Sequence, residues 1–335
     1  MDYAITKSTG RKPWRGHFVE PKQIVANLCQ RMIRAAPRLR LETHRYECGT
    51  RVIDCGVKAP GSLEAGRLLA EVCLGGLGKV RLLPVYGEGL SPPGVMVRTD
   101  HPVAACMASQ YAGWRISGEG YFAMGSGPMR ALAAREPLFA TLGPAEGVAA
   151  AVGVLESSRL PPEEVCRKVA AACGVPAGDL VLAVARTASQ AGGVQIVARS
   201  VETAMHKLLE LGADLSQVES GFGAAPLPPA GGDDLEAMGR TNDAILYGGE
   251  VTLWVRGEDQ TWATLGPRIP SSASPDHGRP FVEIFQRYGR DFYRIDPLLF
   301  GPAVITLANL DTGRSLRFGR RMPEVLRRWV EPGRQ

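Results

Sequence analysis

The side chains best suited to chemistry lie on a predicted helix from about 197 to 211. At about 100° per residue, the apolar residues of this segment share one side of the helix. Arg199, Glu202 and His206 fall within about 60° of each other on the opposite side, and Glu202 sits early in the helix, where negative charge is favoured. An Arg and a Glu three residues apart are usually a solvent-exposed ion pair, and the pattern by itself favours that interpretation.

A second group of candidate residues is the segment Gly125-Ser126-Gly127-Pro128-Met129-Arg130. Pro128 suits the first position of a helix, so the free amides at Ser126 and Gly127 point outward. Together with Arg130 they favour a bound phosphate or carboxylate. The pattern alone indicates an ordinary Ser-capped helix more strongly than an anion site.

Two predicted loops carry further polar residues. Residues 240–243 (Arg-Thr-Asn-Asp) precede a predicted strand, and residues 276–278 (Asp-His-Gly) precede a predicted helix. Asp243 and His277 can orient a polar heterocycle from such positions. The same residue types are also common in ordinary turns that have no binding role, because Asn and Asp side chains form hydrogen bonds with their own backbone there.

Several common catalytic motifs are absent from the sequence. The run Gly75-Gly76-Leu77-Gly78 ends a predicted helix and begins a strand, whereas a dinucleotide-binding loop follows a strand and begins a helix. The chain has no Walker loop, no Gly-x-Ser-x-Gly and no His-Glu-x-x-His. Its histidines have no metal-like spacing, and its seven cysteines form no Cys-x-x-Cys pair. We therefore expect reduced cysteines and no metal site.

The elements that position these residues are predicted from periodicity and turn signals. Helices are expected at 21–36, 62–74, 128–136, 161–173, 197–211 and 280–288. Strands are expected within 39–57 and at 80–85, 95–98, 148–155, 180–185, 244–247, 251–255, 303–310 and 315–318. Residues 103–114 are expected to be helical or irregular, and Asp311-Thr312-Gly313 is expected to form a hairpin turn.

Helices and strands interleave without regular alternation, which indicates the α+β class. At 335 residues the chain is long enough for two domains meeting in a cleft. We expect residues 1–20 to be a basic lead-in, about 21–125 with about 280–335 to form the first α+β domain, and about 126–279 to form the second.

Composition excludes several classes of protein. The formal net charge is only +5, whereas a nucleic-acid-binding protein usually has a stronger basic balance, so we expect no nucleic-acid partner. No apolar run approaches the roughly 20 residues of a membrane span, so we expect no membrane partner. The first twenty residues are polar and basic, unlike a secretory signal. We expect a cytoplasmic protein with a small anionic or polar substrate.

Seven strings in a fixed order and spacing carry a resemblance to one family. They are Asp54-Cys55-Gly56-Val57, Glu71 to Gly78, Ala108 to Trp114, Gly125 to Pro128, Met238 to Ile245, Asp276-His277-Gly278 and Asp291 to Asp296. From about Lys22 to about Gly319 the chain resembles methenyltetrahydromethanopterin cyclohydrolases. The residues of the seven strings are more similar to those of the methylotrophic-bacterial branch than to those of methanogens.

The resemblance implies a reaction in which the 5,10-methenyl derivative of a tetrahydromethanopterin carrier and water give the 5-formyl derivative and a proton. It also implies a pterin cleft between two α+β domains, a homotrimer and no prosthetic group. The family's catalytic Arg-x-x-Glu pair matches Arg199 and Glu202. The resemblance thus reverses the interpretation of that pair as solvent-exposed.

We hypothesise that Glu202 is the general base and that Arg199 positions it and keeps it ionised. Residues in or near the matching strings are candidate contacts for the pterin or its tail: Ser109, Gln110, Ser126, Gly127, Arg130, Asn242, Asp243 and His277. An alternative is a non-catalytic pterin-binding subunit of a formyl-transferring complex. Another is a phosphate or nucleotide enzyme built on residues 125–130, for which the sequence has neither a carboxylate cluster nor a nucleoside pocket.

Overall fold

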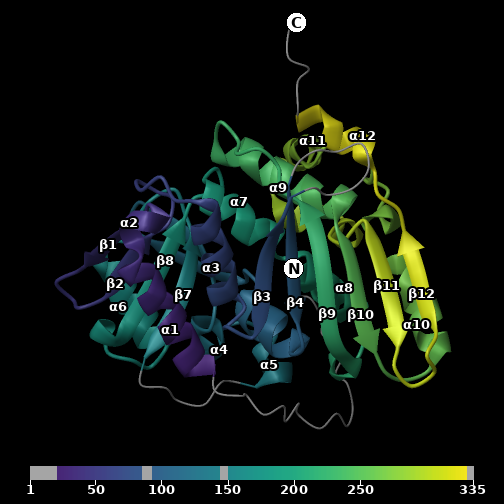
Figure 1. Ribbon diagram of the computed structural model, residues 1–335, viewed down its shortest axis with the longest axis horizontal. Helices are drawn as coiled ribbons and strands as arrows, with labels where there is room; N and C mark the ends of the chain where they lie inside the picture. Colours follow the sequence, from purple (N-terminus) through teal and green to yellow (C-terminus); the bar gives the residue numbers. More distant parts are fainter. Residues whose placement is uncertain (1–20, 85–92, 144–149, 330–335) are drawn as a thin grey trace, which may run out of the picture.

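Two mixed six-stranded sheets organise the chain in a computed structural model, which describes residues 21–84, 93–143 and 150–329. The sheets stand side by side with helices packed on and between them (Figure 1). This arrangement confirms the predicted α+β class. Each sheet is assembled from segments that lie far apart in the sequence, so the position of a side chain depends on long-range pairing.

The first sheet has the strand order β1-β2-β8-β7-β6-β5. Its central pairs, β2 with β8 and β8 with β7, are parallel, and its other pairs are antiparallel. The strands are β1 (Glu42–Arg45), β2 (Arg51–Asp54), β5 (Trp114–Gly118), β6 (Tyr121–Ser126), β7 (Ala151–Glu156) and β8 (Leu180–Ala185). Strand β6 ends at Ser126, one of the candidate site residues.

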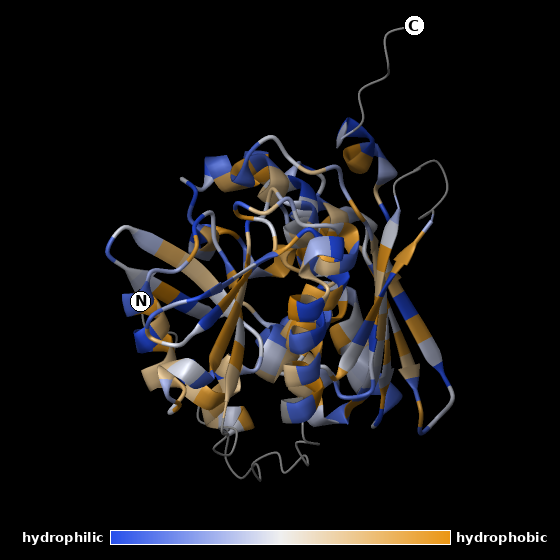
Figure 2. Ribbon diagram, turned by 60° about the vertical axis from the view of Figure 1, so that its left-hand side comes forward, coloured by the Kyte–Doolittle hydropathy of each residue, from blue (hydrophilic) through white to orange (hydrophobic). Residues whose placement is uncertain are grey.

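The second sheet has the order β12-β11-β10-β9-β4-β3, in which only β10 and β11 are parallel. Its strands are β3 (Gly78–Leu83), β4 (Gly94–Thr99), β9 (Val218–Pro226), β10 (Glu250–Val255), β11 (Val304–Asn309) and β12 (Ser315–Gly319). Burial alternates strictly along β10, which indicates one packed face and one open face. Apolar and polar residues alternate along these strands in Figure 2.

Helices cover both faces of the first sheet and one face of the second. Their bounds are α1 (Pro21–Arg34), α2 (Ala36–Leu39), α3 (Leu63–Cys73), α4 (Met129–Ala133), α5 (Phe139–Leu142), α6 (Glu163–Ala172), α7 (Gln190–Val197), α8 (Ser200–Glu210), α9 (Asp234–Gly248), α10 (Asp259–Leu265), α11 (Phe281–Arg287) and α12 (Pro323–Leu326). Helix α8 packs on β9, β10 and β4. A π-helix, η1 (Val103–Gln110), packs on α8, and short 3₁₀ turns fill several connections.

Local signals predicted many of these elements correctly. Ser62 accepts a hydrogen bond from the Ala65 amide as the N-cap of α3, as its position before an apolar run indicates. The glycine run that follows α3 leads into β3, with Gly75 and Gly76 at positive φ. The β11–β12 hairpin, α6, α11, β2, β4, β8 and β10 also lie where they were predicted, within a few residues. Residues 85 and 148–149 of two predicted strands fall outside the described residues.

The helix predicted from about 197 to 211 is confirmed as α8, but it begins three residues later than predicted. Helix α7 ends at Val197 and α8 begins at Ser200, with Arg199 as the N-cap residue of α8. The side-chain amide of Gln110 donates a hydrogen bond of 3.1 Å to the carbonyl oxygen of Ala198. In a continuous helix the carbonyl oxygen of Ala198 would accept a hydrogen bond from the backbone amide four residues later. At the break, the side chain of Gln110, from a distant segment, donates to this oxygen instead.

The prediction of a loop at 240–243 followed by a strand at 244–247 is also wrong, because both lie within α9. Asp233 caps this helix through the Glu236 amide. Residues 244–248 are all buried, and a short apolar run of that kind is common to buried strands and buried helix ends. Strands β5, β6 and β9 were not predicted.

The two sheets also cut across the predicted domain ranges. Strands β9 and β10, expected in the second domain, lie in one sheet with β3 and β4, expected in the first. Likewise β1 and β2 share a sheet with β7 and β8. Strand pairing is long-range, and contiguous blocks of sequence do not reveal it.

Candidate active site around Arg199 and Glu202

Arg199 is a buried residue that links two distant segments to the neighbouring helix α7. Its guanidinium donates to the backbone carbonyl oxygen of Gln110 at 2.5 Å, to Oε1 of Gln195 at 3.1 Å and to Oγ of Ser126 at 3.4 Å. Gln110 ends the π-helix, Ser126 ends β6 and Gln195 lies on α7. A planar fork with several donors suits this task, whereas an ammonium group does not.

Glu202 lies in the first turn of α8 and is only 6% exposed. Burial raises the pKa of its carboxyl to about 7, although the positive charges of Arg199 and Arg130 act in the opposite direction. No hydrogen bond or ion pair engages this carboxylate among the residues that the structure describes. The solvent-exposed pair that the pattern alone favours is therefore wrong.

Arg199 and Glu202 do not form a direct ion pair. Arg199 is held by neutral acceptors, and its charge lowers the pKa of the Glu202 carboxyl from a distance. The contact geometry gives no support to the expectation that Arg199 positions the carboxylate. It does support the expectation that Arg199 favours the ionised form.

Hydrogen bonds made by Ser109 and Gly127 connect the π-helix to the end of β6. Ser126, at that end, accepts a hydrogen bond from Arg199. The hydroxyl of Ser109 donates to the carbonyl oxygen of Cys73 at 2.6 Å, and the amide of Gly127 donates to the carbonyl oxygen of Ser109 at 2.8 Å. Gly127 has φ +88°, a conformation that L side chains rarely adopt. The amide of Gly127 is thus engaged internally, and α4 begins at Met129 without a side-chain cap. The Ser-capped helix predicted here is therefore wrong, and the predicted anion site loses one of its donors.

Arg130 is fully buried and makes four hydrogen bonds within the protein. Its Nε and Nη2 donate to the two oxygens of Glu136 at 2.8 and 2.5 Å, and its Nη1 donates to the carbonyl oxygens of Met107 and Ser109 at 2.9 and 3.3 Å. Two oriented N–H bonds thus meet a carboxylate in the bidentate manner. Arg130 fixes the end of the π-helix and contributes a positive charge near Glu202.

Two aromatic rings near Glu202, those of His206 and Tyr111, form a pair that was not predicted from the sequence. The ring of His206, one helical turn after Glu202, stacks on the ring of Tyr111 with centroids 4.8 Å apart and planes 17° apart. The guanidinium of Arg130 lies 5.0 Å from the centre of the Tyr111 ring. Burial raises the pKa of Tyr111 to about 12, and the charge of Glu202 adds to that shift. The four-residue spacing between Glu202 and His206 was the sequence signal that could have indicated that this ring lies near the carboxylate.

Asn242, Asp243 and His277 lie at a different place, around α9 and α11. Asp243 accepts the Phe281 amide at 2.7 Å at the start of α11, and Asn242 donates to the carbonyl oxygen of Met238 at 2.9 Å. His277 Nδ1 lies 3.1 Å from the Ser271 hydroxyl. Within the described part of the chain, no hydrogen bond joins these residues to Arg199 or Glu202. Their roles as pterin contacts stay predictions.

Comparison with known sequences decides the family. The sequence profile described as Cyclohydrolase (MCH) matches residues 22–329, which is most of the chain and includes every candidate site residue. The chain belongs to the MCH cyclohydrolase family. The matching segment agrees closely with the predicted extent of the resemblance, about Lys22 to about Gly319.

Curated relatives of the MCH family support this membership. The chain is 49% identical to the methenyltetrahydromethanopterin cyclohydrolase of Rhodopirellula baltica over 84% of this chain and 86% of that protein. It is 47% identical to that of Methylobacillus flagellatus over 89% and 91%. For the protein of the same name from Methanosarcina barkeri the identity is 41% over 92% and 97%. The bacterial relatives are thus the more similar, as the motifs indicated.

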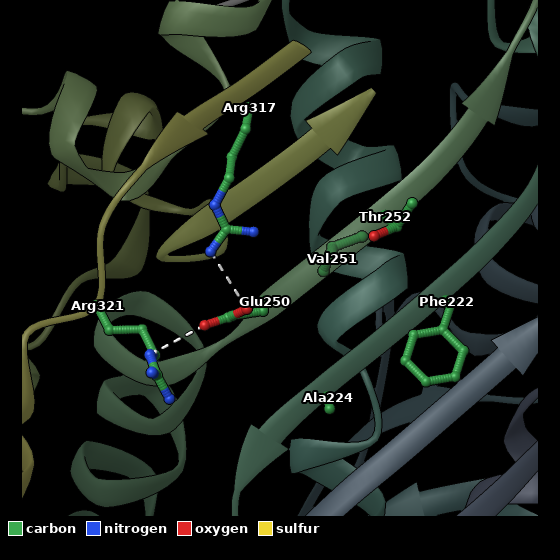
Figure 3. Close-up of a pocket in the computed structure, with 7 residues that line it drawn as sticks. All are labelled: Phe222, Ala224, Glu250, Val251, Thr252, Arg317 and Arg321. Atoms are coloured by element: carbon green, nitrogen blue, oxygen red, sulfur yellow. Dashed lines mark hydrogen bonds and ion pairs between the residues drawn. The ribbon is translucent and has the colours of Figure 1, made fainter. Parts of the chain in front are cut away.

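Other surface features of this MCH family member lie apart from the candidate site. A groove of about 290 Å³ lies on the open face of the second sheet, lined by Phe222, Ala224, Glu250, Val251, Thr252, Arg317 and Arg321. In Figure 3, Glu250 points between Arg317 and Arg321, with which it forms ion pairs of 3.4 and 2.9 Å. None of the candidate site residues lines this groove.

Three potential metal ligands lie close together at the edge of the first sheet. Across the described ranges, Glu42, His44 and Asp54 place ligand atoms within 4.8 Å of one another. The Asp54 carboxylate, however, accepts four backbone amides at 2.7–3.1 Å, which explains its burial as a loop cap. No helix in the described ranges combines the length and the apolar character that a bilayer crossing requires.

Proposed function

We propose that this chain hydrolyses 5,10-methenyltetrahydromethanopterin to the 5-formyl derivative, with Glu202 as general base. The observation that carries the proposal is the state of this carboxylate. It is buried, its pKa is raised to about 7, no residue in the described ranges forms a hydrogen bond with it, and the charges of two guanidinium groups act on it. A base is most effective when its pKa lies near the working pH.

The substrate's own chemistry explains why so little machinery is needed. The methenyl group is an amidinium-like cation bridging two nitrogens, so its carbon is already electrophilic, and we propose no prosthetic group. Glu202 attracts this cation and takes a proton from water while the water oxygen bonds to the carbon. The hydroxyl proton of the adduct then moves to one of the two nitrogens as its C–N bond breaks. One formyl group and one net proton result.

Arg199 serves this step through its charge and its rigid attachment. Its hydrogen bonds to Gln110, Ser126 and Gln195 fix the guanidinium in place. The electrostatic field of Arg199 at Glu202 is therefore preorganised, and the guanidinium does not need to reorient during attack. The positive charge favours the carboxylate form of Glu202, which is the form that accepts a proton.

The setting of the reaction is proposed on the same resemblance. We propose a tetrahydromethanopterin derivative as the only required partner, a homotrimer and a cytoplasmic location, with a role in formaldehyde oxidation or one-carbon interconversion. A non-catalytic pterin-binding subunit is the alternative. The retained Arg199 and Glu202 count against it, since a subunit that only holds the carrier needs neither.

The test uses the purified full-length protein and the methenyl carrier. Loss of the near-ultraviolet absorbance of the carrier should follow addition of the wild-type protein. Glu202→Gln keeps the shape of the side chain and should still bind the carrier, but turnover should fall by about 10² or more. Near-normal turnover in this variant would remove Glu202 from the mechanism, and no turnover in the wild type would favour the non-catalytic subunit.

A further inference from the structure

The proposed mechanism leaves one proton on Glu202 at the end of each turnover. Water contributes two protons; one stays on the released nitrogen and the other remains on the carboxyl. Glu202 must lose this proton before the next attack. Because Glu202 is only 6% exposed, little of its surface contacts bulk solvent directly.

Helix α8 carries a row of titratable side chains that leads from this carboxyl to the surface. Glu202, His206 and Glu210 are spaced four residues apart, so they lie one above the other on one face of the helix, with about 6 Å between successive Cβ atoms. The His206 side chain is 27% exposed and that of Glu210 is 46% exposed. Exposure therefore rises step by step along the row.

The imidazole of His206 is held in place at the centre of the row. Its Nε2 lies 3.7 Å from Oε1 of Glu210, and its ring stacks on Tyr111. Burial lowers the pKa of His206, and Lys207 and Arg130 add to that direction while Glu210 opposes it. The lowered pKa favours the neutral ring, which is the form that accepts a proton.

We propose that His206 carries the proton from Glu202 to solvent, with Glu210 at the outer end of the path. This rests on the proposed role of Glu202 as base. The O–H bond on Glu202 breaks and an N–H bond forms on the inner ring nitrogen, directly or through one water. The outer ring nitrogen then releases its proton to Glu210 or to buffer, and the ring returns to its neutral state.

The test separates proton release from chemistry. In His206→Phe the ring that stacks on Tyr111 is kept while the titratable nitrogens are lost. We expect the single-turnover rate of methenyl loss to stay within about twofold of wild type. The steady-state kcat in dilute buffer should fall about tenfold or more, and millimolar imidazole should restore it. His206→Gln provides a second variant, and His101→Gln, at an exposed histidine, provides the matched control, which should behave as wild type.

Two outcomes would overturn the proposal. One is an unchanged kcat in dilute buffer for both His206 variants. The other is an equal loss of single-turnover rate and kcat that imidazole does not restore, because His206 would then support the site and not the proton path. Failure of the general-base mechanism has a different signature, namely normal turnover in Glu202→Gln whatever the His206 variants do.

Discussion

Arg199 donates a hydrogen bond of 2.5 Å to the carbonyl oxygen of Gln110 and acts on Glu202 only through its charge. Arg199, which favours the ionised form of Glu202, is thus anchored to the end of the π-helix and not to that carboxylate. Among the described residues the carboxylate has no hydrogen-bond partner, which leaves it available for the water and the substrate cation of the proposed mechanism. π-Helical turns are frequent at functional sites, and here one supplies the carbonyl that holds the arginine.

Removing the charge of Arg199 should shift the ionisation of Glu202. In Arg199→Met, the acid limb of the pH profile of kcat/KM should move to higher pH, because the charge that lowers the pKa of Glu202 is gone. Arg199→Lys keeps a charge but not the fork, so its activity should also fall, with a smaller shift of the limb. Steady-state rates measured from pH 5.5 to 9 test this; unshifted limbs in both variants would contradict it.

The wild-type enzyme should lose kcat/KM on acidification. A general base must be ionised, and the pKa of Glu202 is about 7, so kcat/KM should fall about tenfold per pH unit below that value and level off above it. Bound substrate is a cation and stabilises the carboxylate, so the limb of kcat should lie at lower pH than that of kcat/KM. A kcat/KM that is flat from pH 5.5 to 8 would exclude Glu202 as the titrating base.

Glu202 should limit stability at the pH where it works. Its folded-state pKa is raised from 4.5 to about 7, so its contribution to stability is full below about 4.5 and is lost as pH rises through 7. Glu202→Gln should therefore be more stable than wild type at pH 8, by up to about 3 kcal/mol, and equally stable near pH 4.5. Urea unfolding at the two pH values measures the difference. Asp243, whose pKa burial also raises to about 7, is common to both proteins and cancels.

The buried pair of Arg130 and Glu136 should be important for stability. Glu136→Gln leaves the guanidinium of Arg130, which is 0% exposed, without its counter-charge, and such a change costs roughly 3–5 kcal/mol. Denaturant unfolding measures this cost. Glu164→Gln is the control, because Glu164 and its partner Lys168 are both well exposed, and it should leave the unfolding midpoint unchanged. A similar midpoint for the two variants would show that the buried pair is not needed.

Local chemistry decided what could be predicted from the sequence. Ser62 at the start of α3, the glycines after it and the turn at Asp311-Thr312-Gly313 are signals that act within a few residues, and each element lies where it was predicted. The seven strings in register likewise indicated the MCH family, whose Arg-x-x-Glu pair matches Arg199 and Glu202 on a predicted helix. These conclusions do not depend on knowing which distant segments contact one another in the fold.

Tertiary contacts decided the rest. The break between α7 and α8, the helical state of residues 240–247 and the ion pair of Arg130 with Glu136 all depend on partners that the local pattern does not contain. The burial of Glu202 is the central case. Helical periodicity places it on the polar side of α8, but the π-helix covers that side, and desolvation by the covering segment is what raises the pKa of the carboxyl toward neutrality.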